Sequence, residues 1–172
     1  EYAPFEVYAK SLLEYFRGST LTGNQWDSTE SKMFPVLDQY QREAYWALID
    51  IAKQHRGAFL CDGVGLGKTF VGLILIERLV LHERKRVVLF APKAAKEGVW
   101  DPHIKQWLSH VGGEDFSNLS VFSHTDLTRK GDYPERFKRI AEQADAVVID
   151  EAHHFRNRGR RGDEDDDTQP DP

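Results

Sequence analysis

The stretch that decides the fold is residues 62–69, which read Asp-Gly-Val-Gly-Leu-Gly-Lys-Thr. A short apolar run, 58–61, precedes it, and a longer run with helical spacing, 69–81, follows it. Alternating glycines favour a tight turn between two regular elements. The sequence therefore predicts a buried strand, a glycine-rich turn and a helix that begins at a Lys-Thr pair, in this order.

This turn has the chemistry of a phosphate-binding loop. Its glycines let successive N–H groups point at an anion, and the dipole of the helix adds positive potential. Lys68 can then reach the β and γ phosphates of a nucleotide, and the Thr69 hydroxyl can ligate Mg²⁺. A flexible turn that binds nothing is the alternative, and Asp62 stands where the general pattern has glycine. The residues predicted to bind nucleotide here are Gly63, Gly65, Leu66, Gly67, Lys68 and Thr69.

A second feature follows the last apolar run, where Asp150 and Glu151 precede Ala152 and His153. A carboxylate at the end of a buried strand, beside a phosphate loop, is the usual second magnesium contact, and the next carboxylate can deprotonate the attacking water. We expect Asp150 to bind the metal, and Glu151 and Lys68 to be catalytic. Taken alone, an Asp-Glu pair is commonly a solvated turn. His153 is a candidate for coupling, with a surface imidazole as the alternative, and no cluster suggests zinc.

Apolar runs alternate with helical patterns along most of the chain. This alternation predicts an α/β fold with a parallel sheet covered by helices on both faces, and ligands at the carboxyl ends of the strands. The predicted strands are 58–61, 86–91, 119–122 and 146–150, and the predicted helical segments are 40–53, 69–81, 104–108 and 134–143.

The two ends of the chain differ from its middle. Residues 5–17 have the spacing of a short amphipathic helix, and residues 19–32 have the composition of a linker. Residues 159–172 lack large apolar side chains and carry most of the net charge of −5, so we expect a disordered acidic tail. The predicted division is therefore 1–35 for the N-terminal helix and linker, 36–158 for the globular domain, and 159–172 for the tail.

Composition sets weaker limits on function. The single cysteine, Cys61, cannot form an intramolecular disulfide, and neither a secretion signal nor a membrane-spanning run is present. We expect a cytoplasmic or DNA-associated intracellular protein that does not enter a membrane. Without the tail, the chain is nearly neutral, so its charge argues neither for nor against nucleic acid.

The phosphate-loop segment 62–69, the acidic segment 148–153 and the following Phe155-Arg156-Asn157 resemble motifs I and II of superfamily-two helicases, the second being the DEAH motif. The resemblance is greatest to the Swi/Snf-like branch and covers about residues 37–157. It implies the first RecA-like lobe of an ATP-dependent DNA translocase, with ATP and Mg²⁺ as cofactors and double-stranded DNA as partner. Because the chain ends soon after the acidic motif, the lobe would be truncated, with an N-terminal helical extension.

The resemblance implies further site residues. Gln41 corresponds to a glutamine that reads the adenine edge, which an amide can do because it both donates and accepts; a surface glutamine is the alternative. Pro92 and Lys93 correspond to motif Ia, which contacts the nucleic-acid backbone, and Ser123 to motif Ib, which could equally be a capped helix start. We expect Trp100 and the downstream Trp107 to be core residues.

The resemblance also implies what this chain lacks. A second RecA-like lobe and its arginines are missing, so we expect very slow hydrolysis by the chain alone. A missing strand would leave a slot between residues 58–61 and 146–150, and we expect residues 1–172 to associate until the chain is extended past Pro172. The alternatives are a lobe that unwinds RNA or single strands and a non-catalytic nucleotide-binding module. A phosphate-loop kinase or transport ATPase would need a phospho-acceptor site or a signature loop, which we do not find in the sequence.

Overall fold

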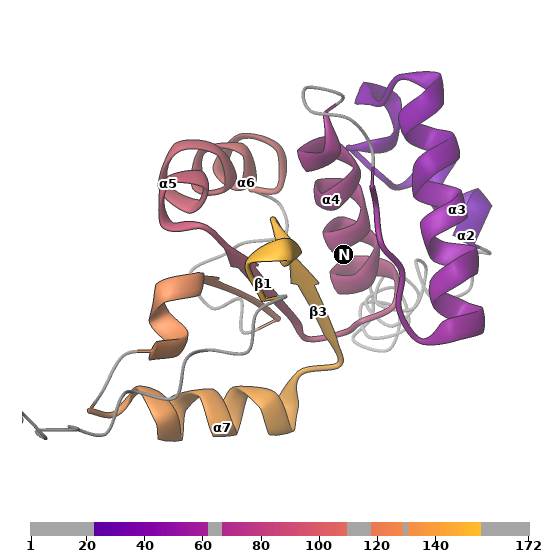
Figure 1. Cartoon of the computed structure of the whole chain (residues 1–172). Coiled ribbons are helices and arrows are strands. Elements are labelled where there is room, and N and C mark those ends of the chain that lie inside the picture. Colours follow the sequence, from indigo (N-terminus) through magenta and orange to yellow (C-terminus); the bar gives the residue numbers. More distant parts are fainter. Residues whose placement is uncertain (1–22, 62–66, 110–117, 129–130, 156–172) are drawn as a thin grey trace, which may run out of the picture.

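A small parallel sheet lies at the centre of the chain. The computed structural model describes residues 23–61, 67–109, 118–128 and 131–155. Within these residues, three strands run parallel in the order β2-β1-β3 (Figure 1). They are β1 (Val87–Ala91), β2 (Leu119–Ser123) and β3 (Ala146–Ile149). The predicted α/β class with a parallel sheet is confirmed, and it is compatible with a RecA-like fold.

The register brings the carboxyl ends of the strands to one edge. Phe90 of β1 is paired with Phe122 of β2 and Ile149 of β3. The ladder continues one residue beyond β3, because the N–H of Asp150 donates to the carbonyl of Phe90 at 2.8 Å. Asp150 therefore sits where the last strand leaves the sheet, the edge at which α/β proteins bind ligands.

Helical segments make up most of the remaining described residues. The helix of the phosphate-loop region runs on into a π-helical turn, and the segment after β1 is helical throughout. The α-helices are α2 (Gly23–Thr29), α3 (Gln39–His55), α4 (Lys68–Glu77), α5 (Lys93–Ala95), α6 (Asp101–Trp107) and α7 (Tyr133–Gln143). The short segments are η1 (Phe34–Val36), η2 (Arg78–His82), η3 (Lys96–Trp100), η4 (His124–Thr128) and η5 (Ala152–Phe155), of which η2 and η3 are π-helical and the others 3-10 helical.

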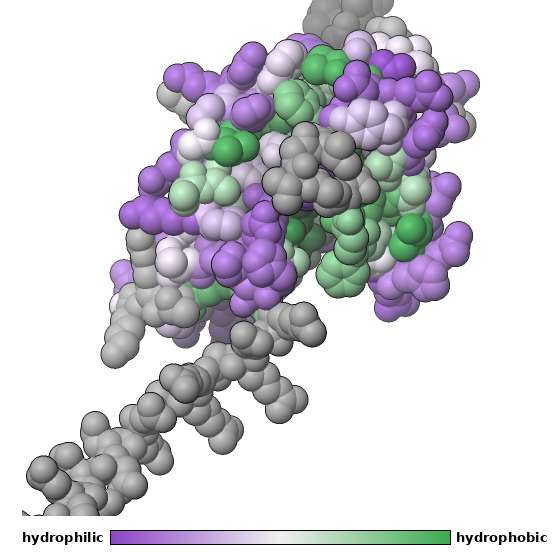
Figure 2. Space-filling view, turned by 45° about the horizontal axis from the view of Figure 1, so that its top comes forward, coloured by the Kyte–Doolittle hydropathy of each residue, from purple (hydrophilic) through white to green (hydrophobic). Residues whose placement is uncertain are grey.

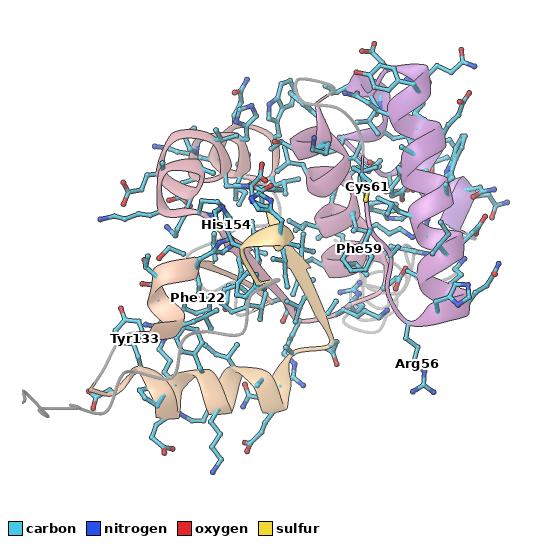
Figure 3. All side chains as sticks on the ribbon, in the orientation of Figure 1. Arg56, Phe59, Cys61, Phe122, Tyr133 and His154 are labelled. Atoms are coloured by element: carbon cyan, nitrogen blue, oxygen red, sulfur yellow. The ribbon has the colours of Figure 1, made fainter. Side chains whose placement is uncertain are left out.

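Helices cover both faces of the sheet. On one face, Leu89 is fully buried in a core shared with Leu73 and Ile74 of α4. On the other face, Phe137 of α7 contacts the rings of Phe90 and Phe122, and Figure 3 shows Phe122 between the sheet and α7. These two layers follow from the alternation of side chains along a strand.

The predicted strand at residues 58–61 is not part of the described sheet. These residues run as an extended segment between α3 and α4, with Phe59 and Cys61 exposed (Figure 3). Among the described residues, β3 pairs on one side only, with β1. A β-branched or aromatic run needs a neighbouring strand to form a ladder, and segment 58–61 has none within the described part of the chain. The expected slot between residues 58–61 and 146–150 stays a prediction.

The expected linker at residues 19–32 is wrong from Gly23 onward. Residues 23–29 form α2, and Trp26, Asp27 and Met33 are buried. Partners distant in sequence cause this burial: Trp26 stacks on His82, and Asp27 accepts a hydrogen bond from Tyr45 at 2.6 Å. The division at residues 35 and 158 stays a prediction, and the expected helix 5–17 and acidic tail lie outside the described residues.

A membrane-spanning helix was not expected. Over the residues that the structure describes, every helix is too short or too polar to cross a bilayer.

Candidate functional site

The described part of the phosphate-loop region begins at the N-terminus of α4. Residues 62–66 lie outside the described residues, and with them the predicted Gly63, Gly65 and Leu66. Gly67 is the N-cap of α4 with φ 70° and ψ 33°, a left-handed conformation that favours glycine. Its carbonyl accepts the first hydrogen bond of the helix, from Phe70 at 2.9 Å. Lys68 and Thr69 then form the first turn, where backbone N–H groups are available to an anion.

Gln41 packs directly against this helix start. A Cβ atom added to Gly67 would meet Nε2 of Gln41, so the end of this side chain lies against the backbone of the helix start. Gln41 is 6% exposed, which excludes the surface-glutamine alternative. Its Oε1 accepts from the N–H of Asp38 at 3.0 Å in a capping box at the start of α3. The structure therefore brings together Gln41 and Gly67, 26 positions apart in the numbering of the chain.

Asp150 lies at the end of β3 and is held by a tryptophan. The indole Nε1 of Trp100 donates to Oδ2 of Asp150 at 2.8 Å. The other end of the same ring packs on α4, because a Cβ added to Gly72 would lie 2.7 Å from Cη2 of Trp100. Gly72 is one helical turn beyond Lys68 and on the same side of α4. Trp100 thus links the acidic strand end to the helix that carries Lys68 and Thr69.

Glu151 adopts an unusual backbone conformation. Its φ is 50°, in the left-handed region, which is uncommon for a residue with a side chain. Its Oε2 lies 3.0 Å from Nδ1 of His153, and both side chains are about half exposed or more. His153 in turn stacks on His154, which contacts His124 of η4. This chain of rings joins the acidic segment to the turn after β2.

The chemistry of these residues fits a magnesium nucleotide. The Thr69 hydroxyl and the Asp150 carboxylate are oxygen ligands of the kind that Mg²⁺ prefers. Among the described residues, the side-chain hydrogen bond to the Asp150 carboxylate is made to Oδ2, by Trp100. Lys68 and the first N–H groups of α4 supply positive charge for phosphate.

The predicted nucleic-acid contacts fall on two separate turns. Pro92 is the N-cap of α5, and Lys93 is exposed at its first position. Ser123 is 4% exposed, and its hydroxyl lies 2.9 Å from that of Thr125. Its N–H donates to Oδ2 of Asp126 at 2.8 Å, as at a capped helix start. Lys93 is therefore accessible to a backbone phosphate, whereas the Ser123 side chain is not.

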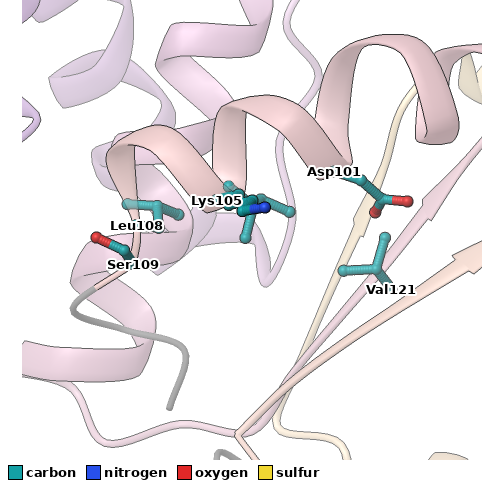
Figure 4. A pocket seen from close by; sticks show the side chains of 6 residues that line it. Asp101, Lys105, Leu108, Ser109 and Val121 are labelled. Atoms are coloured by element: carbon teal, nitrogen blue, oxygen red, sulfur yellow. The ribbon is translucent and has the colours of Figure 1, made fainter. Parts of the chain in front are cut away.

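A shallow hollow beside α6 is a different feature. Its lining contains none of the residues predicted to bind nucleotide (Figure 4). The lining residues are Asp101, Ile104, Lys105, Leu108, Ser109 and Val121.

Sequence reasoning missed the polar contact of Trp100. It predicted a core residue, and the ring is buried, at 3% exposure. The hydrogen bond to Asp150 depends on the packing of η3 between α4 and the sheet, which spacing along the chain does not reveal. The one available signal was Gly72, a glycine inside an otherwise apolar helix, which often marks a close approach by another group.

Comparison with known proteins identifies the class. The family model "Type III restriction enzyme, res subunit" matches residues 35–164. The protein "Uncharacterized ATP-dependent helicase YqhH" of Bacillus subtilis (strain 168) is 32% identical over 117 residues. That match covers 62% of this chain and 20% of the relative, so the chain corresponds to a small part of that protein's length. No solved structure matches the chain.

The fold and the matches together define a helicase-type ATP-binding lobe of the phosphate-loop class. The chain belongs to the family of the type III restriction enzyme res subunit. This agrees with the resemblance to superfamily-two helicases seen in the motifs.

Proposed function

We propose that this chain is the ATP-binding lobe of a motor that couples Mg-ATP hydrolysis to movement on nucleic acid, with double-stranded DNA as the track. The observation that carries the proposal is the position of Asp150. It lies at the carboxyl end of β3 and is joined through Trp100 to the helix that starts with Lys68 and Thr69. An acidic strand end beside a phosphate-binding helix is the arrangement that nucleotide hydrolysis requires. Duplex DNA is proposed from the resemblance of the motifs to the Swi/Snf-like branch.

Each residue has a defined part in this function. Lys68 and the N–H groups at the start of α4 bind the phosphates, and Thr69 and Asp150 hold Mg²⁺, which neutralises charge on the phosphate oxygens. Glu151 accepts the proton of the attacking water. Gln41, fixed against Gly67, offers an amide to the adenine edge. Lys93 and Pro92 would contact the nucleic-acid backbone, and His153 would couple that contact to Glu151.

Calorimetry with ADP tests the nucleotide site. We expect Lys68→Ala to abolish ADP binding, because the lysine supplies the charge that holds the phosphates. Lys138→Ala, which changes an exposed lysine on α7, is the matched control and should bind ADP as the wild type does. Equal affinities of the wild type and Lys68→Ala for ADP would refute the assignment.

The proposed preference for duplex DNA is tested with the same protein preparations. Fluorescence anisotropy with labelled duplex DNA, single-stranded DNA and RNA of equal length should show preference for the duplex. Preference for RNA or a single strand would instead support the unwinding-helicase alternative. Nucleotide binding without affinity for any of the three would support a nucleotide-binding module.

A further inference from the structure

Trp100 occupies a position between two parts of the site that come from distant segments. Its indole is buried and reaches Asp150 with its N–H at 2.8 Å. The far edge of its six-membered ring fills the place that a side chain at position 72 would take. An indole is a rigid plane, so its two contacts fix how far the Asp150 carboxylate lies from α4.

The hydrogen bond also sets the orientation of the carboxylate. An indole N–H can only donate, so it stays bonded to Asp150 in the ionised form that a metal requires. With Oδ2 held, rotation of the carboxylate is restricted and Oδ1 is left for a ligand. Carboxylates that bind metals are commonly oriented by a second hydrogen bond of this kind.

The contact with α4 places the indole behind the phosphate-binding turn. Gly72 is three residues after Thr69 and four after Lys68, so all three lie on one side of the helix. Glycine lowers helix propensity by about 1 kcal/mol relative to alanine. The close approach of the ring gives a reason for glycine at position 72, because even a methyl group would collide with Cη2 of Trp100.

We propose that Trp100 is a positioning residue for the magnesium ion: it orients the carboxylate of Asp150 and sets its distance from Thr69. This inference rests on the proposed function, because it needs Asp150 and Thr69 to share a metal. The competing interpretation is that Trp100 only fills the core between α4 and the sheet, as a buried tryptophan commonly does.

The test replaces Trp100 by phenylalanine, which keeps an aromatic ring and removes the N–H. ADP affinity is measured by calorimetry across a Mg²⁺ titration. For Trp100→Phe, a Mg²⁺ concentration about tenfold higher should be needed to reach half of the metal-dependent rise in ADP affinity. Tenfold is the lower end of the usual effect of removing a group that orients a metal ligand. ADP affinity without Mg²⁺ should stay within a factor of about two, well below that tenfold effect, because the phosphate-binding groups are untouched.

The matched control is Trp107→Phe. Trp107 lies on the same helical segment and its ring contacts Phe70 of α4, not Asp150. This variant removes an indole beside α4 and should leave the Mg²⁺ dependence unchanged. If Trp100→Phe shifts the Mg²⁺ dependence no more than Trp107→Phe does, the proposal is refuted and Trp100 is a packing residue.

A double-mutant cycle shows whether Trp100 acts through Asp150. In the Asp150→Ala background, adding Trp100→Phe should have no further effect on the Mg²⁺ dependence of ADP binding; a full additional effect would overturn the proposal. Lys68→Ala separates this inference from the proposed function. If Lys68→Ala binds ADP normally, the assignment of the nucleotide site itself is wrong. If Lys68→Ala does not bind ADP and Trp100→Phe shows the wild-type Mg²⁺ dependence, the positioning role alone is refuted.

A measurement that leaves Trp100 in place covers the case in which Trp100→Phe does not fold. The chain has four tryptophans, so ¹⁵N-labelled protein gives four indole N–H resonances by NMR. One of them should shift when Asp150 is replaced by alanine, and the same one should shift when Mg²⁺ is added to the ADP complex. If the resonance that responds to Asp150→Ala is insensitive to Mg²⁺, the proposal fails.

Discussion

At the scale of single residues, Glu151 combines a strained backbone with an exposed carboxylate. A residue with a side chain in the left-handed region costs about 1–2 kcal/mol relative to ordinary helical backbone. The φ of 50° turns the chain sharply at the end of β3, and the carbonyl of Glu151 then accepts from the N–H of His154 at 3.0 Å. Such strain is found at functional sites, where the surrounding structure holds it in place. The proposed roles differ accordingly, because Asp150 bonds to Trp100 whereas the Glu151 carboxylate lies beside His153.

Glu151→Gln tests the predicted base. We expect hydrolysis of ATP to fall by about 10²–10⁴-fold, the usual contribution of a general base, because an amide cannot accept the proton. The affinity for Mg-ADP should stay the same, since Glu151 is not assigned to binding. Single-turnover hydrolysis with protein in excess over ATP makes slow rates measurable.

The control is Glu142→Gln, which changes an exposed glutamate of α7. It should hydrolyse ATP at the wild-type rate. Turnover by Glu151→Gln at that same rate would remove Glu151 from the mechanism and leave the choice of base open.

At the scale of elements, a buried polar network joins α2 to α3 and η2. Asp27 of α2 is fully buried and accepts hydrogen bonds from the Tyr45 hydroxyl and, at 3.0 Å, from Trp46 Nε1. Arg78 of η2 lies 3.5 Å from Asp27 and also donates to the Tyr45 hydroxyl at 3.2 Å. A buried carboxylate is stable only when paired and hydrogen-bonded. The network therefore fixes α2 against α3 and η2.

Tyr45→Phe should destabilise the fold by about 1–3 kcal/mol, the cost of removing a hydrogen bond to a buried charged group. Urea unfolding followed by circular dichroism measures the loss. Tyr133→Phe, on the half-buried start of α7, is the matched control and should cost less. A Tyr45→Phe variant as stable as this control would mean that the network does not contribute to stability.

Tyr45 also makes the stability of the fold depend on pH. Burial, followed by the hydrogen bond to Asp27, raises the pKa of Tyr45 well above its usual value. In the unfolded chain the tyrosine ionises at a pH of about 10, whereas the folded chain keeps it neutral. The stability from Tyr45 is thus present below pH 10 and lost as the pH rises above it. Tyr45→Phe should flatten the decline of stability above about pH 10 relative to Tyr133→Phe.

At the scale of the whole molecule, apolar side chains reach the surface on β3, which pairs on one side only among the residues that the structure describes. Val147 and Ile149 of β3 are 55% and 43% exposed, and Phe59 of the extended segment 58–61 is 83% exposed. Figure 2 shows apolar residues at the surface of one face, between polar ones. An unpaired strand edge with apolar side chains is a template for association with another chain.

We expect residues 1–172 to associate as concentration rises, with Val147→Lys weakening this association. A lysine on an edge strand opposes pairing, and a tenfold rise in the Kd of association corresponds to about 1.4 kcal/mol. Sedimentation velocity over a range of concentrations measures the effect. Val99→Lys, at a 36% exposed valine of η3, is the control and should associate like the wild type. A compact wild-type monomer at every concentration would refute the expectation.

The sequence alone determined the local parts of this molecule. The spacing of apolar residues predicted the bounds of α3, α4, α7 and the strands of the sheet to within a few residues of those observed. It could do so because the backbone geometry of each element fixes the periodicity of its side chains. The run Gly-Lys-Thr at 67–69 predicted a helix start of the observed kind, since left-handed backbone at its N-cap favours glycine. Asp150 was placed correctly at a strand end.

Only the tertiary structure decided which distant groups meet. Residues 58–61 have the composition of a strand, yet a strand forms only where a neighbour pairs with it, and none does among the described residues. Residues 23–32, part of the expected linker, lack periodicity in the sequence, but partners on α3 and η2 bury Asp27 and Trp26. The sequence predicted that Trp100 lies in the core, because tryptophan is commonly buried. Its hydrogen bond to Asp150 exists because β3, η3 and α4 pack together. Contacts of this kind depend on how distant segments are arranged in three dimensions, and a pattern along the sequence does not predict that arrangement.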